Sequence, residues 1–430
     1  MPHSPRMDES GVWFEDRLVG YLWRNSVGYI GFRYESSWLN AENSGNHFAI
    51  SRTLPLTPDD FTAEEGLAHR FFANLLPEGD VRSHIVRDLK IANTDFDLLR
   101  AIGGECAGAL TILPVEQSPT KDRRYRPLAD IELAQLVARR GQIYAAWPAN
   151  ERPRLSLAGA QDKCPVLIAA GQYYLPVSDA ATSHILKFEL TDYRHLPVYE
   201  AFTTYLARRI GLPVVEIELC TIEGQTYAQI KRYDRVWEDT ADKQGKVLRL
   251  HQEDFCQALG YGHEKKYQDA GGPSFAECFR LLQEISTDPI IDTQYLLRWQ
   301  IFNVLAGNSD GHAKNLSLLY SQDNGVRLAP FYDLICTRAI ERIDTRLAFD
   351  VGDQRNPDLI RKTHWNTLAQ QCDVRPQFLG NLVQETAALL LENIAGVKES
   401  FQQQTGDHPE LQRIEQVVKK QCQRAKKEKK

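Results

Sequence analysis

Hydrophobic and polar residues alternate along short stretches near the start of the chain. VWFEDRLVGYLWRN and VGYIGFRYE, within residues 12–38, show this pattern between glycines, which predicts antiparallel β-hairpins. A helical pattern follows in TAEEGLAHRFFANLL, which starts at Thr62 with acidic residues in its first turn and ends before Pro77. Another helix is predicted at 94–102, and GGECAGALTILP then leads into a strand.

A polar connector separates these elements from a second group of strands. Residues 116–153 are rich in Pro, Arg and Gln and contain one helical pattern, at 129–140. Beyond residue 154 strands dominate again, with a helix at about 198–210 that ends at Gly211. The predicted strands are 164–169, 172–176, 183–188, 214–222 and 225–233.

After residue 250 the hydrophobic spacing is mostly helical. The patterns therefore predict an α+β protein with a β-rich subdomain at 1–115, a connector at 116–153, a strand-rich lobe at 154–240 and a mainly helical lobe at 241–430. A chain of 430 residues is long enough for two or three such compact parts.

Composition and charge narrow the class of protein. The chain is 43% hydrophobic and 25% charged, and its net charge of −6 gives no overall attraction to nucleic acid or membrane. Eight cysteines form no C-x-x-C pair or metal-site spacing with histidine, and no secretory signal precedes them. No apolar run reaches the ~18 residues of a membrane span. We therefore expect a cytoplasmic protein with free thiols and no membrane partner.

Lysines and arginines crowd the last residues, VVKKQCQRAKKEKK. A solvated helix end and a contact with nucleic acid or an acidic partner both explain this composition. The sequence alone leaves both interpretations open.

The stretch NSDGHAKN, between a helical and a strand pattern, is dense in functional groups. Asp310 and Asn315 have the spacing D-x-x-x-x-N of the protein-kinase catalytic loop, in which the Asp orients the substrate hydroxyl and the Asn holds magnesium. Taken alone, the pair is equally typical of a polar turn between a helix and a strand.

A predicted hairpin follows this stretch and brings a second acidic residue, Asp333, back towards it. LSLLY and VRLAPFY are strand patterns separated by SQDNG, in which Asn324 and Gly325 favour a tight turn. Asn315 and Asp333 are equally far from residue 324, and an antiparallel hairpin returns the chain to its start. We therefore expect both side chains at one end of the hairpin, near Asp310. Oxygen donors of this kind suit Mg²⁺ together with nucleotide phosphates.

Two earlier segments are candidates for the phosphate contacts of such a site. Lys187 ends a predicted strand ahead of a helix that carries Glu200, the arrangement of the kinase lysine and glutamate. An edge-strand lysine and a solvated glutamate would give the same pattern. In RLSLAGAQDK, the small residues Ala158, Gly159 and Ala160 let backbone N–H groups approach phosphate oxygens, although an ordinary turn has the same composition.

In this order along the chain, the segments resemble the HipA-type serine/threonine kinases, the toxin half of bacterial HipA/HipB toxin–antitoxin pairs. The similar stretches span almost the whole chain, so the resemblance is more specific than a single catalytic loop. They are FFANLLPEGDVR (71–82), FDLLRAIGGECAGALTILP (96–114), LSLAGAQDK (155–163), HILKF (184–188), RLHQEDFCQALG (249–260), DAGGPS (269–274), NSDGHAKNLSLL (308–319) and LAPFYDL (328–334).

The resemblance implies a two-lobed protein-kinase-like fold with an additional N-terminal β-rich subdomain, in which 154–240 is the N-lobe and 241–430 the helical C-lobe. It implies ATP and Mg²⁺ as cofactors and a protein Ser or Thr as acceptor, an aminoacyl-tRNA synthetase in characterised relatives, with growth arrest as the result. It also implies a HipB-like helix-turn-helix antitoxin as partner, with DNA contacted through that antitoxin.

The resemblance also assigns roles to residues. Asp310 is the implied catalytic base, and Lys187 is the implied ATP lysine. Asn315 and Asp333 are the implied metal ligands. Ser156 matches the family's regulatory serine, whose phosphorylation switches the kinase off, since a phosphate there would compete with ATP for the same N–H donors. The implied phosphate-covering loop consists of Leu157, Ala158, Gly159, Ala160 and Gln161.

Some positions depart from the family pattern. Glu189 follows LKF where many relatives have proline, and KRYD replaces an ERFD-like stretch. Lys231, Tyr233 and Asp234 lie in this stretch, where adenine is generally held by backbone groups, so nucleotide binding is still expected. His312 stands where most protein kinases carry a lysine, and it would either meet the γ-phosphate or cap the turn.

Two other functions use the same residues. A kinase-like phosphotransferase acting on a small molecule needs the same acids, but the N-terminal module and the family-wide motifs argue against it. The second alternative is a kinase-fold protein that acts mainly as a binding partner or corepressor of a DNA-bound antitoxin. The intact Asp310, Asn315, Asp333 and Lys187 argue against a loss of catalysis, but they do not exclude such a binding role beside it.

Overall fold

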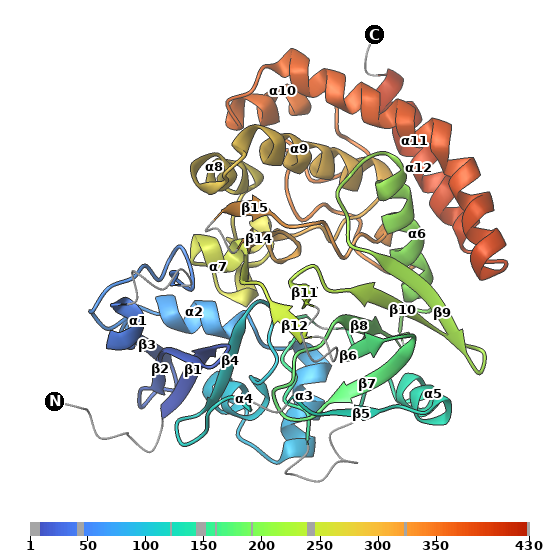
Figure 1. Ribbon diagram of the computed structural model, residues 1–430. Coiled ribbons are helices and arrows are strands. Elements are labelled where there is room, and N and C mark those ends of the chain that lie inside the picture. Colours follow the sequence, from blue (N-terminus) through green and yellow to red (C-terminus); the bar gives the residue numbers. More distant parts are fainter. Residues whose placement is uncertain are drawn as a thin grey trace. The chain divides into compact units, whose positions relative to one another are not determined.

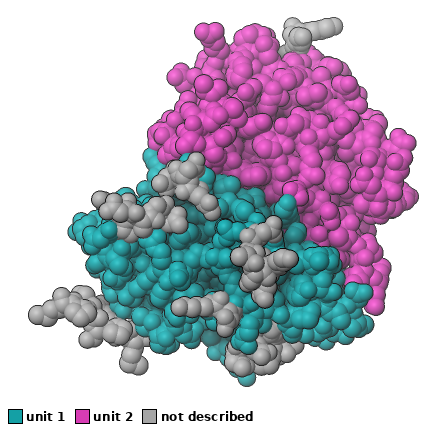
Figure 2. Space-filling model, viewed as in Figure 1, with its two compact units in different colours: residues 1–187, 231–263, 319–325 teal, residues 188–230, 264–318, 326–430 magenta. Residues whose placement is uncertain are grey.

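The structure of the chain is a computed structural model that describes residues 9–40, 47–120, 123–142, 152–159, 161–190, 192–238, 246–321 and 325–427 (Figure 1). Helices and antiparallel strands both occur, which confirms the α+β class. The chain forms two compact units, each built from separate stretches (Figure 2). Unit 1 contains residues 1–187, 231–263 and 319–325, and unit 2 contains 188–230, 264–318 and 326–430.

Unit 1 begins with a four-stranded antiparallel sheet of order β3-β2-β1-β4. Its strands are β1 (Glu9–Phe14), β2 (Arg17–Arg24), β3 (Ile30–Tyr34) and β4 (Leu110–Pro114). Val12 pairs with Gly20, and Gly20 in turn pairs with Tyr34. The hairpins predicted within residues 12–38 are therefore confirmed.

Four helices share a hydrophobic core with this sheet. They are α1 (Ser36–Leu39), α2 (Leu67–Ala73), α3 (Gly79–Leu89) and α4 (Asp95–Ile102). Phe32 of β3 and Phe72 of α2 are fully buried in one core, with ring centroids 5.6 Å apart. The helix predicted to start at Thr62 begins only at Leu67, because Gly66 has a left-handed φ of 70° that interrupts the helical backbone.

The second half of unit 1 is built on four strands in the order β5-β7-β6-β8. These are β5 (Tyr125–Pro127), β6 (Lys163–Ala169), β7 (Gln172–Pro176) and β8 (His184–Lys187), so the strands predicted at 164–169, 172–176 and 183–188 are confirmed. The remaining elements of unit 1 are α5 (Asp130–Ala138), β11 (Arg235–Glu238), β12 (Lys246–Arg249), β13 (Gln252–Asp254) and α7 (Phe255–Leu259).

Unit 2 combines a hairpin with a set of helices (Figure 1). Helix α11 packs against α6, α9, α10 and α12. The predicted strand at 214–222 begins at Ile217, because Val214 makes only an isolated bridge with Phe331. The elements that lie wholly or partly in unit 2 are α6 (Leu196–Arg209), β9 (Ile217–Ile222), β10 (Gln225–Lys231), α8 (Phe275–Ile285), α9 (Pro289–Ala306), β14 (Ser317–Tyr320), β15 (Val326–Leu328), α10 (Lys362–Gln371), α11 (Pro376–Thr405) and α12 (Leu411–Lys427).

The compact units do not follow a single cut through the chain. Residues 188–230 belong to unit 2 and residues 231–263 to unit 1. The four divisions expected from the sequence stay predictions. In the part of the chain that the structure describes, no helix is both long and apolar enough to cross a membrane.

Candidate functional site

The catalytic-loop segment starts where α9 ends. Gly307 closes that helix with a left-handed φ of 77°. The next turn is tied to Asn303, whose carbonyl accepts the Asn308 N–H at 2.9 Å and whose Oδ1 accepts Asn308 Nδ2 at 3.0 Å. Gly311 passes so close that a Cβ there would lie 2.5 Å from Asn303 Nδ2. The loop is therefore anchored to the end of a buried helix.

Asp310 is exposed on this loop, but contacts on several sides hold it in place. The Tyr267 hydroxyl donates a hydrogen bond of 2.6 Å to Asp310 Oδ1. Asn308 Oδ1 accepts the Asp310 N–H at 3.2 Å, and Asn315 Nδ2 donates to the Asp310 carbonyl at 3.2 Å. An exposed carboxylate in a fixed orientation suits a group that receives a proton from a second molecule.

The hairpin after the loop folds back as expected. The Tyr332 hydroxyl donates to the Lys314 carbonyl at 2.7 Å, which brings the chain that continues into Asp333 beside the chain that continues into Asn315. Asp333 has a φ of 55°, a left-handed conformation that is uncommon outside glycine and that is enriched at functional sites. The turn residue Asn324 lies outside the described residues.

His312 lies buried beneath the same loop. Its ring meets that of Tyr267 edge-on, with centroids 5.1 Å apart. Burial lowers the pKa of His312; Asp310 opposes this shift, and the charges of Lys266 and Lys314 add to it. Its side chain makes no capping hydrogen bond in the following 3₁₀ turn, and Nδ1 has no hydrogen-bond partner among the described residues. The turn-capping alternative therefore has no support here, and the ring keeps a nitrogen for a ligand.

These residues fit a magnesium ion. Mg²⁺ prefers oxygen ligands and takes few from the protein when phosphates supply the others. Asn315 Nδ2 donates to the Asp310 carbonyl, which leaves Asn315 Oδ1 available to bind a metal ion. The Tyr332–Lys314 hydrogen bond brings the chain at Asp333 beside the chain at Asn315, and the charge of Asp333 acts on His312. Within the described residues, no group of three or more His, Cys, Asp and Glu has the arrangement of a metal site.

The small-residue loop of unit 1 is anchored at both ends. Ser156 is fully buried: its N–H donates to the Glu105 carbonyl at 2.9 Å and its hydroxyl donates to the Leu75 carbonyl at 2.9 Å. Farther along, the Gly159 carbonyl accepts the Glu78 N–H at 3.1 Å. The loop residue Ala160 lies outside the described residues.

Between these anchors the loop has free donors. The backbone N–H groups of Leu157 and Ala158 make no hydrogen bond to another described residue. Gly159 has a positive φ of 107°. Successive unpaired N–H groups in such a turn form a concave anion site, so this loop fits a phosphate. Gln161, at its end, is half-buried.

Two lysines face each other beside this loop. In the antiparallel pair β6–β8, Lys163 and Lys187 are register partners, so their side chains leave the same face of the sheet. Lys187 is buried, and Lys163 Nζ donates to the Ala158 carbonyl at 2.6 Å. Ammonium groups form charge-assisted hydrogen bonds to phosphate oxygens. The pair therefore adds a second feature suited to phosphate.

The predicted adenine segment has a different character. Lys231 is exposed at the end of β10, and the Tyr233 hydroxyl donates to Gln252 Oε1. Asp234 is buried, with its Oδ1 2.9 Å from Arg232 Nε and its Oδ2 accepting the Gly108 N–H at 2.7 Å. The Asp234 carboxylate is thus used inside unit 1, and its role in nucleotide binding stays a prediction.

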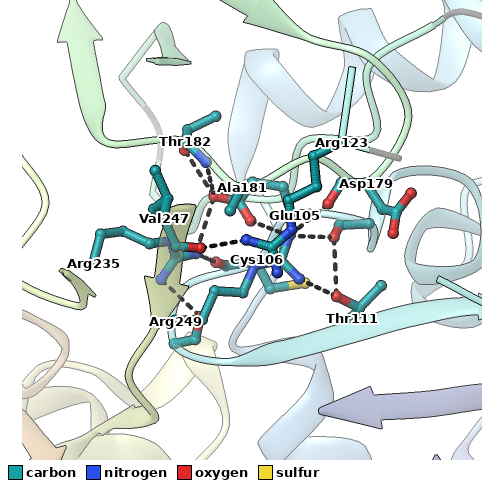
Figure 3. Close-up of polar contacts among 12 residues, drawn as sticks. Glu105, Cys106, Thr111, Arg123, Asp179, Ala181, Thr182, Arg235, Val247 and Arg249 are labelled. Carbon is teal, nitrogen blue, oxygen red and sulfur yellow. Dashed lines mark hydrogen bonds and ion pairs between the residues drawn. The ribbon is translucent and has the colours of Figure 1, made fainter. Parts of the chain in front are cut away.

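The fully buried Glu105 lies at the centre of a cluster of arginines in unit 1. Glu105 forms ion pairs with Arg235 and Arg249, at 3.0 and 2.7 Å, and accepts the Thr182 N–H at 2.9 Å (Figure 3). It also forms an ion pair with Arg232, at 2.9 Å. Burial alone would raise the pKa of Glu105, but the three guanidinium groups lower it to about 2. The cluster joins distant parts of unit 1 and has the character of a structural centre.

The structure thus groups the predicted residues into two sets. The first set lies in unit 2 and consists of Asp310, His312, Asn315 and Asp333. The second set lies in unit 1 and consists of Lys187 and the loop that follows Ser156. Glu200 is buried in α6 of unit 2, and its pairing with Lys187 stays a prediction.

Sequence reasoning missed Tyr267 and Lys163. Tyr267 lies just before DAGGPS, and nothing in its spacing points to Asp310. Lys163 ends the stretch LSLAGAQDK, and only the strand register shows that it faces Lys187.

Comparisons with known proteins agree on one family. A family model described as the HipA N-terminal domain matches residues 10–113, and one described as the HipA-like C-terminal domain matches residues 155–394. The candidate kinase Y4mE of Sinorhizobium fredii is 37% identical over 87% of this chain and 89% of its own length. The serine/threonine-protein kinase toxin HipA of Shewanella oneidensis is 30% identical over 80% of this chain and 79% of its own.

A solved structure agrees with the family models. It is a complex of HipA, HipB and operator DNA from Shewanella oneidensis, and this chain superposes with a TM-score of 0.81 and 25% sequence identity. The match covers 97% of this chain and 99% of the other. The kinase-like fold expected from the sequence is therefore confirmed.

Proposed function

Since the chain belongs to the HipA family of kinases, we propose that it transfers the γ-phosphate of ATP to a serine or threonine of a protein. The observation that carries this proposal is the exposed Asp310, oriented by Tyr267, with Asn315 and the Asp333 segment beside it. Asp310 accepts the proton of the acceptor hydroxyl while that oxygen bonds to the γ-phosphorus and ADP leaves.

Groups from unit 1 bind the phosphates in this proposal. The N–H groups of Leu157 and Ala158 and the ammonium groups of Lys163 and Lys187 supply hydrogen-bond donors and positive charge. Asn315 and Asp333 would hold Mg²⁺, which when bound neutralises charge on the phosphates. His312, with its unsatisfied nitrogen, would contact the γ-phosphate.

We also propose that Ser156 is an inhibitory autophosphorylation site. In this structure its hydroxyl is buried against the Leu75 carbonyl, so the segment must leave this position before a phosphate can be attached. A phosphate is too large and too charged for the buried position. Modification would therefore displace the loop whose N–H groups face ATP.

The proposed partners follow from the relatives. A HipB-type helix-turn-helix antitoxin is supported by the solved complex of HipA with HipB and operator DNA, and contact with DNA would then be indirect. Phosphorylation of an aminoacyl-tRNA synthetase with growth arrest is the outcome proposed by resemblance. A test of the partner is co-purification with a small helix-turn-helix protein encoded next to this one.

Labelled ATP tests the enzymatic proposal. The purified, unphosphorylated chain is incubated with γ-labelled ATP and magnesium, and the label is mapped by mass spectrometry. We expect label on Ser156 in the wild type and in Asp60→Ala, a control at an exposed aspartate, and none in Asp310→Ala. An unlabelled wild type would contradict a kinase, and label that reached only added metabolites would support a small-molecule phosphotransferase instead.

A further inference from the structure

A cavity of about 240 Å³ opens among the helices of unit 2. Helices α9, α10, α11 and α12 all contribute to its wall (Figure 1). Its apolar part includes Leu305 of α9, Val383 of α11 and the indole of Trp365 of α10, which are all buried. Neither the catalytic loop nor the phosphate loop lines it, so the function proposed above makes no use of it.

The rim of the cavity is positively charged. Arg361 and Lys362 lie there, both exposed, and neither forms an ion pair with a described residue. Arg424 also lines the cavity, but its guanidinium is engaged by Asp358. No Asp or Glu occurs among the described residues of the lining. Within this described lining, two cations without an ion-pair partner, beside a wall that is partly apolar and has no acid, favour an anion.

Helix α11 keeps the cavity open with a glycine. Gly380 lies in the wall, and a Cβ added there would have no heavy atom within 4 Å. Glycine in a helix interior costs roughly 0.5–1 kcal/mol relative to alanine, so this position gives up stability for space. Gly396 of the same helix also has open space around it, but it lies outside the lining.

We propose that this cavity binds a small aromatic anion. Its ring system packs against Trp365 and the apolar wall, and its carboxylate or phosphate meets Arg361 and Lys362. The size fits, because a protein cavity of roughly 150 Å³ accepts benzene and this one, at about 240 Å³, has room for a second ring. Charge-assisted hydrogen bonds from guanidinium and ammonium groups to the acid supply the orientation.

The probe is 2-naphthoate, with neutral 2-naphthamide as its matched control. Binding to the full chain is measured by isothermal titration calorimetry and ligand-observed NMR, neither of which needs phosphoryl transfer. We expect one saturable site with a dissociation constant of about 1 mM or tighter. The amide should bind about tenfold more weakly or not at all, because it lacks the charge.

Matched variants locate the site. Gly380→Leu fills the cavity and should weaken 2-naphthoate binding at least about tenfold, whereas Gly396→Leu should leave it unchanged. The double variant Arg361→Glu/Lys362→Glu should lose the anion, whereas Lys420→Glu, at an exposed lysine of α12, should keep it. Thermal unfolding shows whether each variant is folded. If Gly380→Leu does not fold, the double variant Arg361→Glu/Lys362→Glu alone tests whether 2-naphthoate binds at this cavity.

Three results would overturn the proposal. The first is a wild type without saturable binding of 2-naphthoate. The second is equal binding of the amide, which would remove the anion requirement. The third is binding that survives both Gly380→Leu and the charge reversal. Self-association that is lost in the charge-reversal variant, without naphthoate binding, would assign the cavity to a second copy of the chain.

Discussion

The Tyr267 hydroxyl donates a 2.6 Å hydrogen bond to Oδ1 of Asp310, although 43 positions separate the two residues. If Asp310 is the base, Tyr267 sets the direction of its carboxylate. Tyr267→Phe should therefore lower kcat about tenfold, the effect of one hydrogen bond to a charged group, with the KM for ATP unchanged. Steady-state kinetics on a peptide acceptor separates the two parameters.

The control for this variant is Tyr205→Phe, whose ring packs against Phe401 in unit 2. It should leave both kinetic parameters unchanged. A Tyr267→Phe enzyme with the wild-type kcat would remove Tyr267 from the catalytic arrangement, and a rise in KM alone would point to nucleotide binding instead.

The opposed lysines of β6 and β8 give a prediction on affinity. Lys163→Met and Lys187→Met should each weaken ATP binding at least about tenfold, because each removes a charge that faces the phosphates. Adenosine, which has no phosphate, should bind both variants as it binds the wild type. Calorimetry with the two ligands checks this, with Lys420→Met as a surface control. Equal losses for adenosine and ATP would mean that the strands are disturbed.

The ionisation of Glu105 makes the free energy of unfolding depend on pH. Its folded pKa of about 2 lies below its ordinary value of 4.5, so its contribution is complete above pH 4.5 and is lost as the pH falls towards 2. Glu105→Gln should cost roughly 3 kcal/mol of unfolding free energy at neutral pH, and less below pH 3. Urea unfolding at several pH values measures this, and the exposed Glu392→Gln should show no such trend. A constant difference between wild type and Glu105→Gln at all pH values would contradict the ion-pair account.

Glu253 should change the free energy of unfolding with pH in the opposite direction to Glu105. It is fully buried, with Oε2 2.6 Å from Ser51 Oγ and Oε1 accepting the Arg52 N–H at 3.1 Å and the Tyr320 hydroxyl. Burial outweighs these hydrogen bonds and raises its pKa from 4.5 to about 7. The folded state therefore holds an extra proton between pH 4.5 and 7, and stability falls as the pH rises through this range.

Glutamine mimics the protonated form of this side chain. Relative to Glu253→Gln, the wild type should lose roughly 3 kcal/mol of unfolding free energy between pH 4.5 and 8. Urea unfolding at these two pH values is the measurement. A difference that does not change with pH would mean that Glu253 is ionised in the folded protein throughout.

Much of the local structure was predictable because its causes are local. Alternation within residues 12–38 and the short strand patterns within 164–188 predicted strands that the structure contains. The D-x-x-x-x-N spacing and the following hairpin predicted that Asn315 and the Asp333 segment would return to one place. The Thr62 helix start was wrong, because the left-handed backbone at Gly66 outweighs the acidic first turn expected there.

The sequence by itself therefore determined many of the elements, the family and the D-x-x-x-x-N spacing of Asp310 and Asn315. Only the tertiary structure decided that Tyr267 holds Asp310, that Lys163 faces Lys187, and that Glu105 pairs with arginines as distant in the chain as Arg249. The physical reason is range. Turns, caps and periodicity follow from neighbouring residues, whereas strand register and buried charge pairing follow from the packing of segments that lie far apart in the chain.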